Sequence, residues 1–430
     1  MLERLFRLRE HGTDARTELL AGVTTFLTMA YIIFVNPEIL SGTGMDRDAV
    51  FVATCLAAVT GTLIMAFVAN WPIGMAPGMG LNAFFAFTIV GTLGYSWQQA
   101  LGAVFISGVI FLIITITGIR SWLIAGIPRS LRAAIAAGIG LFLAIIALSS
   151  SGIVVAHPAT KIALGNLTEP GALYAILGFF IIAALDALRV RGAILIGILV
   201  VTVLSMVLGH NSFSGIVAAP PSLAPTFLQL DIMGALQAGF VHVILVLVLV
   251  EVFDATGTMI GVAKRANLIT EDNPGRLNRA LFSDSTAIVA GSLLGTSSTT
   301  AYVESAAGVQ AGGRTGLTAL TVAVLFLLAL FFSPLAGSVP AYATAPALLY
   351  VAGLMLREIT EIDWDDVTEA TPAALATLAM PFTYSIANGL AFGFISYVVL
   401  KFSTGRARDV HPACFVVAVL FVVKFAFFAE

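Results

Sequence analysis

Long apolar runs recur from one end of this 430-residue chain to the other, and they restrict its fold more than any other feature. A helix needs about 20 apolar residues to cross the roughly 30 Å hydrocarbon core of a bilayer. The charge content agrees with this reading, because 10% of the residues are charged, against about 25% in a typical soluble domain. We therefore expect an all-α polytopic membrane protein embedded in the lipid bilayer.

The apolar runs divide into fifteen candidate segments. They cover residues 17–38, 49–69, 75–92, 98–117, 133–150, 171–187, 192–208, 236–263, 281–295, 296–312, 315–333, 341–356, 370–386, 387–403 and 410–427. The first fourteen form two halves of similar plan, each with four longer segments, a connection and three more. Because seven is an odd number, the halves would lie in opposite orientations, so the sequence predicts a 7+7 inverted repeat. The segment at 410–427 is then an extra one, either transmembrane or interfacial.

Arginine and lysine concentrate on alternate connections, whereas the connections at 209–235 and 334–340 contain neither. Cytoplasmic connections of membrane proteins are enriched in these residues. We therefore expect a multi-pass protein of the inner (plasma) membrane with a cytoplasmic N-terminus. The first residues, MLERLFRLR, mix apolar and basic side chains. They suggest either an amphipathic piece on the inner membrane surface or a solvated tail.

One segment in each half is broken near its start. The stretch WPIGMAPGMGLNAFFAF, residues 71–87, is rich in proline and glycine, and GTSSTTAYVESAAGVQAGG, residues 295–313, contains a run of serine and threonine. Proline removes an N–H donor, and serine and threonine offer competing hydrogen bonds to the backbone. Paired breaks in two repeats point to the binding site of a transporter. We expect half-helices to begin near Leu81 and near Tyr302, with free N–H groups directed at the space between them.

Three carboxylates stand out because ionisable side chains at membrane depth are costly and mark substrate or proton paths by default. Glu251, Asp254 and Thr258 share one face of the helix predicted at 236–263, and Glu304 falls in the first turn of the second half-helix. The alternative is a structural carboxylate that caps a broken helix or pairs with a base, but we expect no lysine or arginine partner inside the predicted segments. Glu251 could also merely tune Asp254 or support packing.

Four further side chains near the breaks are candidates for substrate contacts. Asn82 either presents its amide to a ligand or caps the first half-helix. The rings of Phe85 and Tyr302 could flank a flat ligand, although most aromatic residues in a membrane protein serve packing. Ser305, which follows Glu304, is the fourth. The histidines and cysteines show no ligand spacing, so we expect no metal and no cofactor.

Five stretches in this order carry a family resemblance: TELLAGVTTFLTMAYIIFVNPEIL, APGMGLNAFFAF, FDATGTMIGVAKRANL, TSSTTAYVESAAGVQAGGRTGLTAL and SPLAGSVPAYATAPALLYVAG. They resemble the AzgA-like purine permeases, the adenine/guanine/hypoxanthine branch of the nucleobase–cation symporter-2 (nucleobase–ascorbate transporter) family. The resemblance implies fourteen segments with short strands in segments 3 and 10. By position, the family's eighth-segment acid matches Asp254 and its tenth-segment glutamate matches Glu304. Uracil-transporting relatives have a histidine where this chain has Thr258, which argues against a histidine proton relay.

The resemblance also implies a core that carries the substrate and a gate that forms a homodimer. The corresponding division is a cytoplasmic arm at 1–16, core repeat 1 at 17–118, gate repeat 1 at 119–209, an extracytoplasmic connection at 210–235, core repeat 2 at 236–333, gate repeat 2 at 334–403 and a C-terminal apolar segment at 404–430.

Together these features predict a secondary transporter, not an enzyme, with no nucleic-acid partner. It would import a purine nucleobase, adenine favoured and hypoxanthine or guanine possible, by proton symport with elevator-like movement of the core against the gate. Glu304 would hold the base and Asp254 would contact it and take up the proton, with Glu251 as a further proton-coupling candidate. The alternatives are another nucleobase or a small anion on the same scaffold, or an intramembrane enzyme. The stretch FDATG resembles the Asp-Thr-Gly of aspartic proteases, but Ala255 intervenes.

Overall fold

The computed structural model describes residues 2–236, 241–266, 268 and 275–427. Most of these residues are helical. Within this part of the chain, seven helical stretches are long and apolar enough to cross a membrane, and four shorter apolar helices accompany them. The expectation of a mostly helical, polytopic membrane protein is confirmed. The count of fourteen segments stays a prediction.

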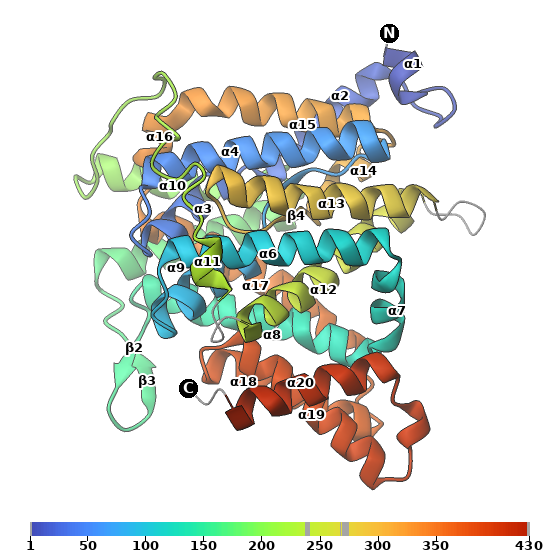
Figure 1. Ribbon diagram of the computed structural model, residues 1–430. Helices are drawn as coiled ribbons and strands as arrows, with labels where there is room; N and C mark the ends of the chain where they lie inside the picture. Colours follow the sequence, from blue (N-terminus) through green and yellow to red (C-terminus); the bar gives the residue numbers. More distant parts are fainter. Residues whose placement is uncertain (1, 237–240, 267, 269–274, 428–430) are drawn as a thin grey trace.

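The first half of the chain forms the elements coloured blue to green in Figure 1. They are α1 (Leu2–Phe6), α2 (Ala15–Met29), α3 (Ile32–Ser41), α4 (Arg47–Ile64), the π-helix η1 (Met65–Ala69), β1 (Met75–Pro77), α5 (Met79–Ala83), the π-helix η2 (Phe84–Thr92), α6 (Trp97–Ile116), α7 (Ile119–Gly126), α8 (Arg129–Ser150), β2 (Val154–His157), β3 (Lys161–Leu164), α9 (Pro170–Ala187) and α10 (Ala193–Val207).

The second half contains the yellow to red elements. They are α11 (Ile232–Ala235), α12 (Val241–Arg265), α13 (Gly275–Leu294), β4 (Thr299–Ala301), α14 (Ser305–Gln310), α15 (Gly316–Ala329), the 3₁₀-helix η4 (Leu330–Phe332), α16 (Ser333–Gly337), α17 (Ala341–Met355), the 3₁₀-helix η5 (Leu356–Glu361), α18 (Val367–Phe382), α19 (Ile386–Ser403), the 3₁₀-helix η6 (Ala407–Asp409) and α20 (Pro412–Phe427).

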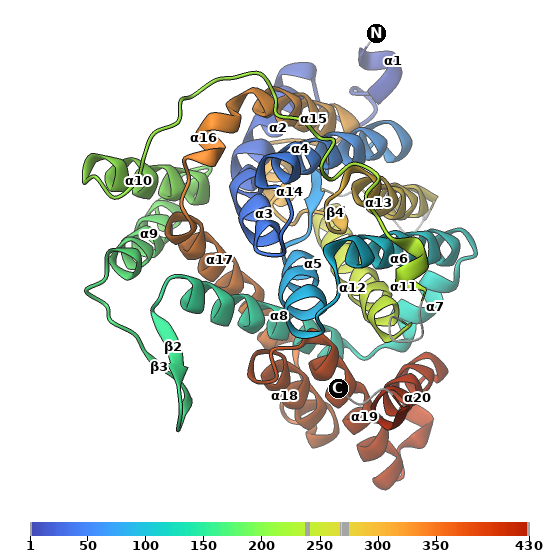
Figure 2. The ribbon, with the colours of Figure 1, turned by 60° about the vertical axis from the view of Figure 1, so that its left-hand side comes forward.

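The long helices pack in two sets. In the first set, α15 packs on α2 and α4, and α13 packs on α4 and α6 (Figure 1). In the second set, α8 packs on α17 and α18, and α9 packs on α10 and α17. Figure 2 shows α14 and β4 among the helices of the first set, and α5 next to α3, α12 and α8. We call the first set, together with β1, β4, α5 and α14, the strand-bearing set, and we call the second set the outer set.

Strands β1 and β4 form a short antiparallel pair inside the strand-bearing set. Met75 pairs with Ala301 and Pro77 pairs with Thr299, and every residue of both strands is buried. Each strand lies in one of the two breaks predicted from the sequence. The pairing satisfies backbone groups that a broken helix would leave without partners at membrane depth.

The start of α15 is capped by a residue from the other half of the chain. The buried Glu18 side chain accepts hydrogen bonds from the backbone N–H groups of Arg314 at 2.8 Å, Thr315 at 3.2 Å and Thr318 at 3.2 Å. The first turn of a helix leaves such donors without an intrahelical partner. The glutamate of the TELLAG stretch therefore joins α2 to α15.

The N-terminal arm packs against the protein. Phe6 and Leu8 are buried against Leu317 of α15, and the side chain of Asn70 donates to the Phe6 carbonyl at 3.1 Å. The sequence suggested that this arm lies on the membrane surface or is a solvated tail. Phe6 and Leu8 do neither, because both pack against α15.

The C-terminal helix α20 packs on α19 and α7. Its Lys424 is buried and donates to the Asn388 amide oxygen at 3.2 Å. Lys401 of α19 is also buried and lies 2.8 Å from Glu369. The expectation that the predicted segments contain no basic side chain was therefore wrong for 387–403 and 410–427. Both lysines lie near segment ends, where long side chains reach polar partners.

Candidate substrate site

Two half-helices leave the strand pair from its opposite ends. Helix α5 follows β1 with Gly78 as its N-cap, and α14 follows β4 with Glu304 as its N-cap. These starts lie close to the predicted ones, near Leu81 and Tyr302. Because β1 and β4 are antiparallel, the amino ends of both half-helices face the strand pair, which favours negative charge and hydrogen-bond acceptors there.

Tyr302 and Ser305 hold the two breaks together. The Tyr302 N–H donates to the Gly74 carbonyl at 3.0 Å, and its hydroxyl donates to the Pro77 carbonyl at 2.6 Å. The Gly74 N–H donates to the Ser305 Oγ at 3.0 Å. Both side chains are buried. These two candidates therefore support the site.

The Glu304 carboxylate is positioned by a tyrosine from the first repeat. The Tyr31 hydroxyl donates to Glu304 Oε1 at 2.5 Å, and the Tyr31 and Tyr302 rings lie 6.5 Å apart at 45°. Tyr31 is buried between α2 and α3, whereas Glu304 is half-buried. Tyr31 was missed from the sequence. Its position in the run FLTMAYIIF offers no signal beyond a polar hydroxyl among apolar residues.

Glu251 is fully buried and connects three elements. Its Oε1 accepts from Ser107 of α6 at 3.1 Å and from Ser298, just before β4, at 2.9 Å. Its Oε2 has no hydrogen-bond partner among the described residues. This arrangement favours the interpretation of Glu251 as a residue that supports the strand pair.

Asp254 and Thr258 follow on the same helix. The backbone of Asp254 belongs to α12, but its side chain lies outside the described residues. Thr258 is half-buried. The spacing of the three residues places them on the Glu251 face of α12, so their contact with substrate stays a prediction.

Asn82 lies within α5, so the capping interpretation was wrong: the cap is Gly78. The hydroxyl of Ser297 donates to the Asn82 amide oxygen, which joins α5 to the approach of β4. The amide nitrogen is buried and has no partner within the described part of the chain. An unused buried donor of this kind can bind a ligand acceptor. Phe85, at the start of η2, is fully buried.

A further buried carboxylate, Asp284 in α13, was not among the residues predicted from the sequence. Its Oδ1 accepts from the Ala301 N–H and the Thr300 hydroxyl of β4, each at 3.2 Å. The Arg120 guanidinium, which comes from α7, lies 3.9 Å from the other oxygen. The signal was available, because Asp284 is an acid inside a predicted segment, like Glu251. Its basic partner, Arg120, lies in the connection between two predicted segments, and basic partners were considered only inside the segments.

The broken helices and their buried carboxylates define a multi-pass membrane transporter. The model of a permease family, Xan_ur_permease, matches residues 16–392. The chain belongs to this permease family, and its similarity to adenine and guanine/hypoxanthine permeases confirms the resemblance to the AzgA-like purine permeases.

Relatives match the chain over nearly its whole length. Adenine permease AdeP of Escherichia coli K12 is 50% identical over 428 residues, covering 99% of this chain and 96% of that protein. Guanine/hypoxanthine permease PbuO of Bacillus subtilis is 44% identical, covering 98% of this chain and 99% of that protein. The transmembrane domain of a cyanobacterium bicarbonate transporter, BicA, has a TM-score of 0.61 at 16% identity, covering 95% of this chain and 96% of that one. The last likeness concerns the fold alone.

Proposed function

We propose that this protein imports a purine nucleobase, adenine preferred over hypoxanthine and guanine, across the inner membrane by proton symport. The names of the two relatives described above, an adenine permease and a guanine/hypoxanthine permease, support the substrate class. The higher identity to the adenine permease supports the preference. In this proposal the N-terminus is cytoplasmic and the protein works as a homodimer.

The observation that carries the proposal is the half-buried Glu304 carboxylate at the start of α14, held by Tyr31 beside the ring of Tyr302. A neutral purine has a flat face and a rim of N–H donors and ring-nitrogen acceptors. A carboxylate accepts from such donors more strongly than a neutral group does. An aromatic ring stacks on the flat face, and the unused Asn82 donor suits a ring nitrogen.

In this mechanism Glu304 holds the base, and Asp254 contacts the base and takes up the proton. A carboxylate that gains a proton on the outer side loses the charge that makes its passage through the membrane costly. The strand-bearing set then moves against the outer set and carries the substrate with it. The two sets of packed helices support this elevator movement, because each packs extensively within itself.

Uptake of labelled adenine into proteoliposomes tests the proposal. We expect a proton gradient in sodium-free medium to drive uptake, and its collapse to stop it. Unlabelled hypoxanthine and guanine should compete, and uracil and xanthine should compete less. Glu304→Gln and Asp254→Asn should each abolish gradient-driven uptake, whereas Glu358→Gln, at an exposed position, should not.

The outcomes separate the parts of the proposal. Absence of uptake of any of these purines by the folded wild-type protein would contradict the substrate class. Full proton-driven uptake by both carboxylate variants would leave the substrate class standing and contradict the site.

A further inference from the structure

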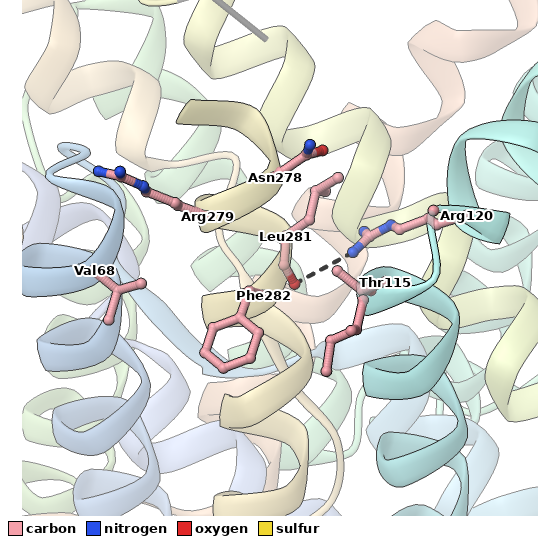
Figure 3. A pocket seen from close by; sticks show the side chains of 9 residues that line it. Val68, Thr115, Arg120, Asn278, Arg279, Leu281 and Phe282 are labelled. Atoms are coloured by element: carbon pink, nitrogen blue, oxygen red, sulfur yellow. Dashed lines mark hydrogen bonds between the residues drawn. The ribbon is translucent and has the colours of Figure 1, made fainter. Parts of the chain in front are cut away.

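A recess of about 320 Å³ lies beside α13 of the strand-bearing set (Figure 3). It crosses the first turns of α13 and is flanked by the ends of η1 and α6 and the start of α7. Its lining residues are Val68, Thr115, Ile116, Gly118, Arg120, Asn278, Arg279, Leu281 and Phe282.

The walls of the recess are apolar side chains that the protein leaves uncovered. Ile116 is 67% exposed, Val68 39% and Phe282 37%. Ile116 is the last residue of α6, and Val68 lies in η1, which continues α4. Both belong to helical stretches that are long and apolar enough to span a membrane. Apolar side chains exposed at such positions contact the acyl chains of surrounding lipids.

Two arginines give the recess a positive charge. Arg120 forms part of the floor: it is 1% exposed, donates to the Leu281 carbonyl at 3.4 Å and lies 3.9 Å from Asp284. Arg279 is exposed and takes part in none of the salt bridges among the described residues. Figure 3 shows Arg279 on the side of Val68 and Arg120 on the opposite side of α13. Arg279 is therefore the charge available to a ligand.

We propose that this recess binds an anionic phospholipid of the surrounding bilayer. Its phosphate interacts with Arg279, and its acyl chains lie along Val68, Ile116 and Phe282. Residues 279 and 282 lie about 4.5 Å apart along a helix axis, so head group and first carbons fit one above the other. Basic recesses between membrane helices bind anionic head groups. A water-soluble anion would gain nothing from the uncovered apolar walls.

Native mass spectrometry of the purified full-length protein tests this site with phosphatidylglycerol and phosphatidylcholine of identical chains. We expect tighter binding of phosphatidylglycerol, and Arg279→Gln should weaken it about fivefold, the effect of removing one charge near a membrane surface. Arg408→Gln, which removes an exposed arginine outside the recess, should leave binding unchanged. Ile116→Ser keeps the charge and should weaken both lipids.

Further measurements decide between sources of the bound group. Unchanged melting temperatures of the variants establish that each is folded. Retention of wild-type phosphatidylglycerol binding by Arg279→Gln and Ile116→Ser would overturn the proposal. Displacement of the lipid by millimolar inorganic phosphate would also overturn it, in favour of a soluble-anion site, whereas retention of the lipid in phosphate supports it.

Discussion

Three buried or half-buried carboxylates of this molecule differ in how fully their oxygens are satisfied. Within the described part of the chain, Glu18 accepts from three backbone N–H groups and a hydroxyl, Glu251 from two serine hydroxyls, and Glu304 from one phenol. A carboxylate offers about four acceptor sites. Glu18 is therefore committed to the fold, whereas Glu304 keeps acceptor sites that a substrate can use. All three side chains are carboxylates, so their different roles follow from the number of hydrogen bonds that each accepts and not from their charge.

The Tyr31–Glu304 contact yields a prediction at the residue scale. Tyr31→Phe removes one hydrogen bond to a charged group, worth about 1.5–3 kcal/mol, and leaves the ring in place. We expect the KM for adenine uptake to rise about tenfold, because Glu304 loses the group that orients it. Tyr350→Phe is the matched control, since Tyr350 of α17 donates to Asp186 of α9 at 2.6 Å, and both helices belong to the outer set. An unchanged KM and uptake rate for Tyr31→Phe would contradict a role for Tyr31 in positioning Glu304.

Some of these residues were predictable from the sequence, whereas their hydrogen-bond partners were not. Glu251 and Glu304 are identifiable because an acid in an apolar run is unusual. Tyr31 lies 273 positions from Glu304, and Ser298 lies 47 positions from Glu251. Such contacts depend on tertiary packing, which a single sequence does not specify. Asp284 was overlooked although the same rule would have selected it.

At the scale of elements, the crossing of α2 and α15 depends on the absence of a side chain at Gly22. A Cβ there would lie 2.7 Å from the Thr318 carbonyl oxygen and would also meet the Thr321 side chain. We expect Gly22→Ala to destabilise the protein by about 1–3 kcal/mol, the usual cost of overpacking. Gly353→Ala, in α17 with no atom within 4 Å of the new Cβ, should be neutral or stabilising. Melting temperatures in one detergent compare the two, and equal values would contradict the close crossing.

The N-terminal arm carries a pH dependence. Burial, together with the nearby Arg276 and Arg7, lowers the pKa of His11, while Glu10 and Glu18 act in the opposite direction. The folded arm thus binds a proton less readily than the unfolded arm, whose histidine pKa is about 6.5. The stabilisation is present above that pH and is lost as the pH falls below it. The protection of residues 2–13 against hydrogen exchange, corrected for the intrinsic exchange rate at each pH, should therefore fall at pH 5.5 more in wild type than in His11→Gln. Equal responses would contradict a role for His11.

The elements themselves were predictable to different degrees. Proline and glycine in 71–87 and serine and threonine in 295–313 located both breaks, because they act on the local backbone. The exact starts at Met79 and Ser305 depend on strand pairing across the two halves. The π-helices η1 and η2 were not expected, since a shift in the backbone hydrogen-bond register has no distinct residue pattern.

At the scale of the whole molecule, hydropathy indicates where helices lie but not which ones pack together. Helix α8 contacts α17 and α18, which are far along the chain. Their apolar faces look alike to a hydropathy profile, because lipid and protein are both apolar surroundings. The antiparallel pairing of β1 with β4 is the arrangement that two halves of opposite orientation would give. The division at 17–118, 119–209, 236–333 and 334–403 stays a prediction that only movement can test.

A disulfide between the two sets provides that test. A Cβ at Gly80 of α5 would lie 4.0 Å from the Cβ of Ile139 in α8, within the roughly 3.5–4.5 Å that a disulfide requires. Gly80→Cys/Ile139→Cys therefore joins the strand-bearing set to the outer set. Within the outer set, Gly197 of α10 and Ile182 of α9 offer a matched pair at 3.6 Å. Both pairs belong in a chain whose two native cysteines are replaced by alanine.

If transport needs the two sets to move against each other, oxidation of the Gly80/Ile139 pair should stop adenine uptake, and reduction should restore it. Oxidation of the Gly197/Ile182 pair should leave uptake unchanged, because both residues belong to one set. Gly80 is close to Asn82, so a thermal-shift measurement of adenine binding must accompany uptake. Binding that survives while uptake is lost indicates blocked movement and not a blocked site. Wild-type uptake with a disulfide verified by mass spectrometry would rule out relative movement at this contact.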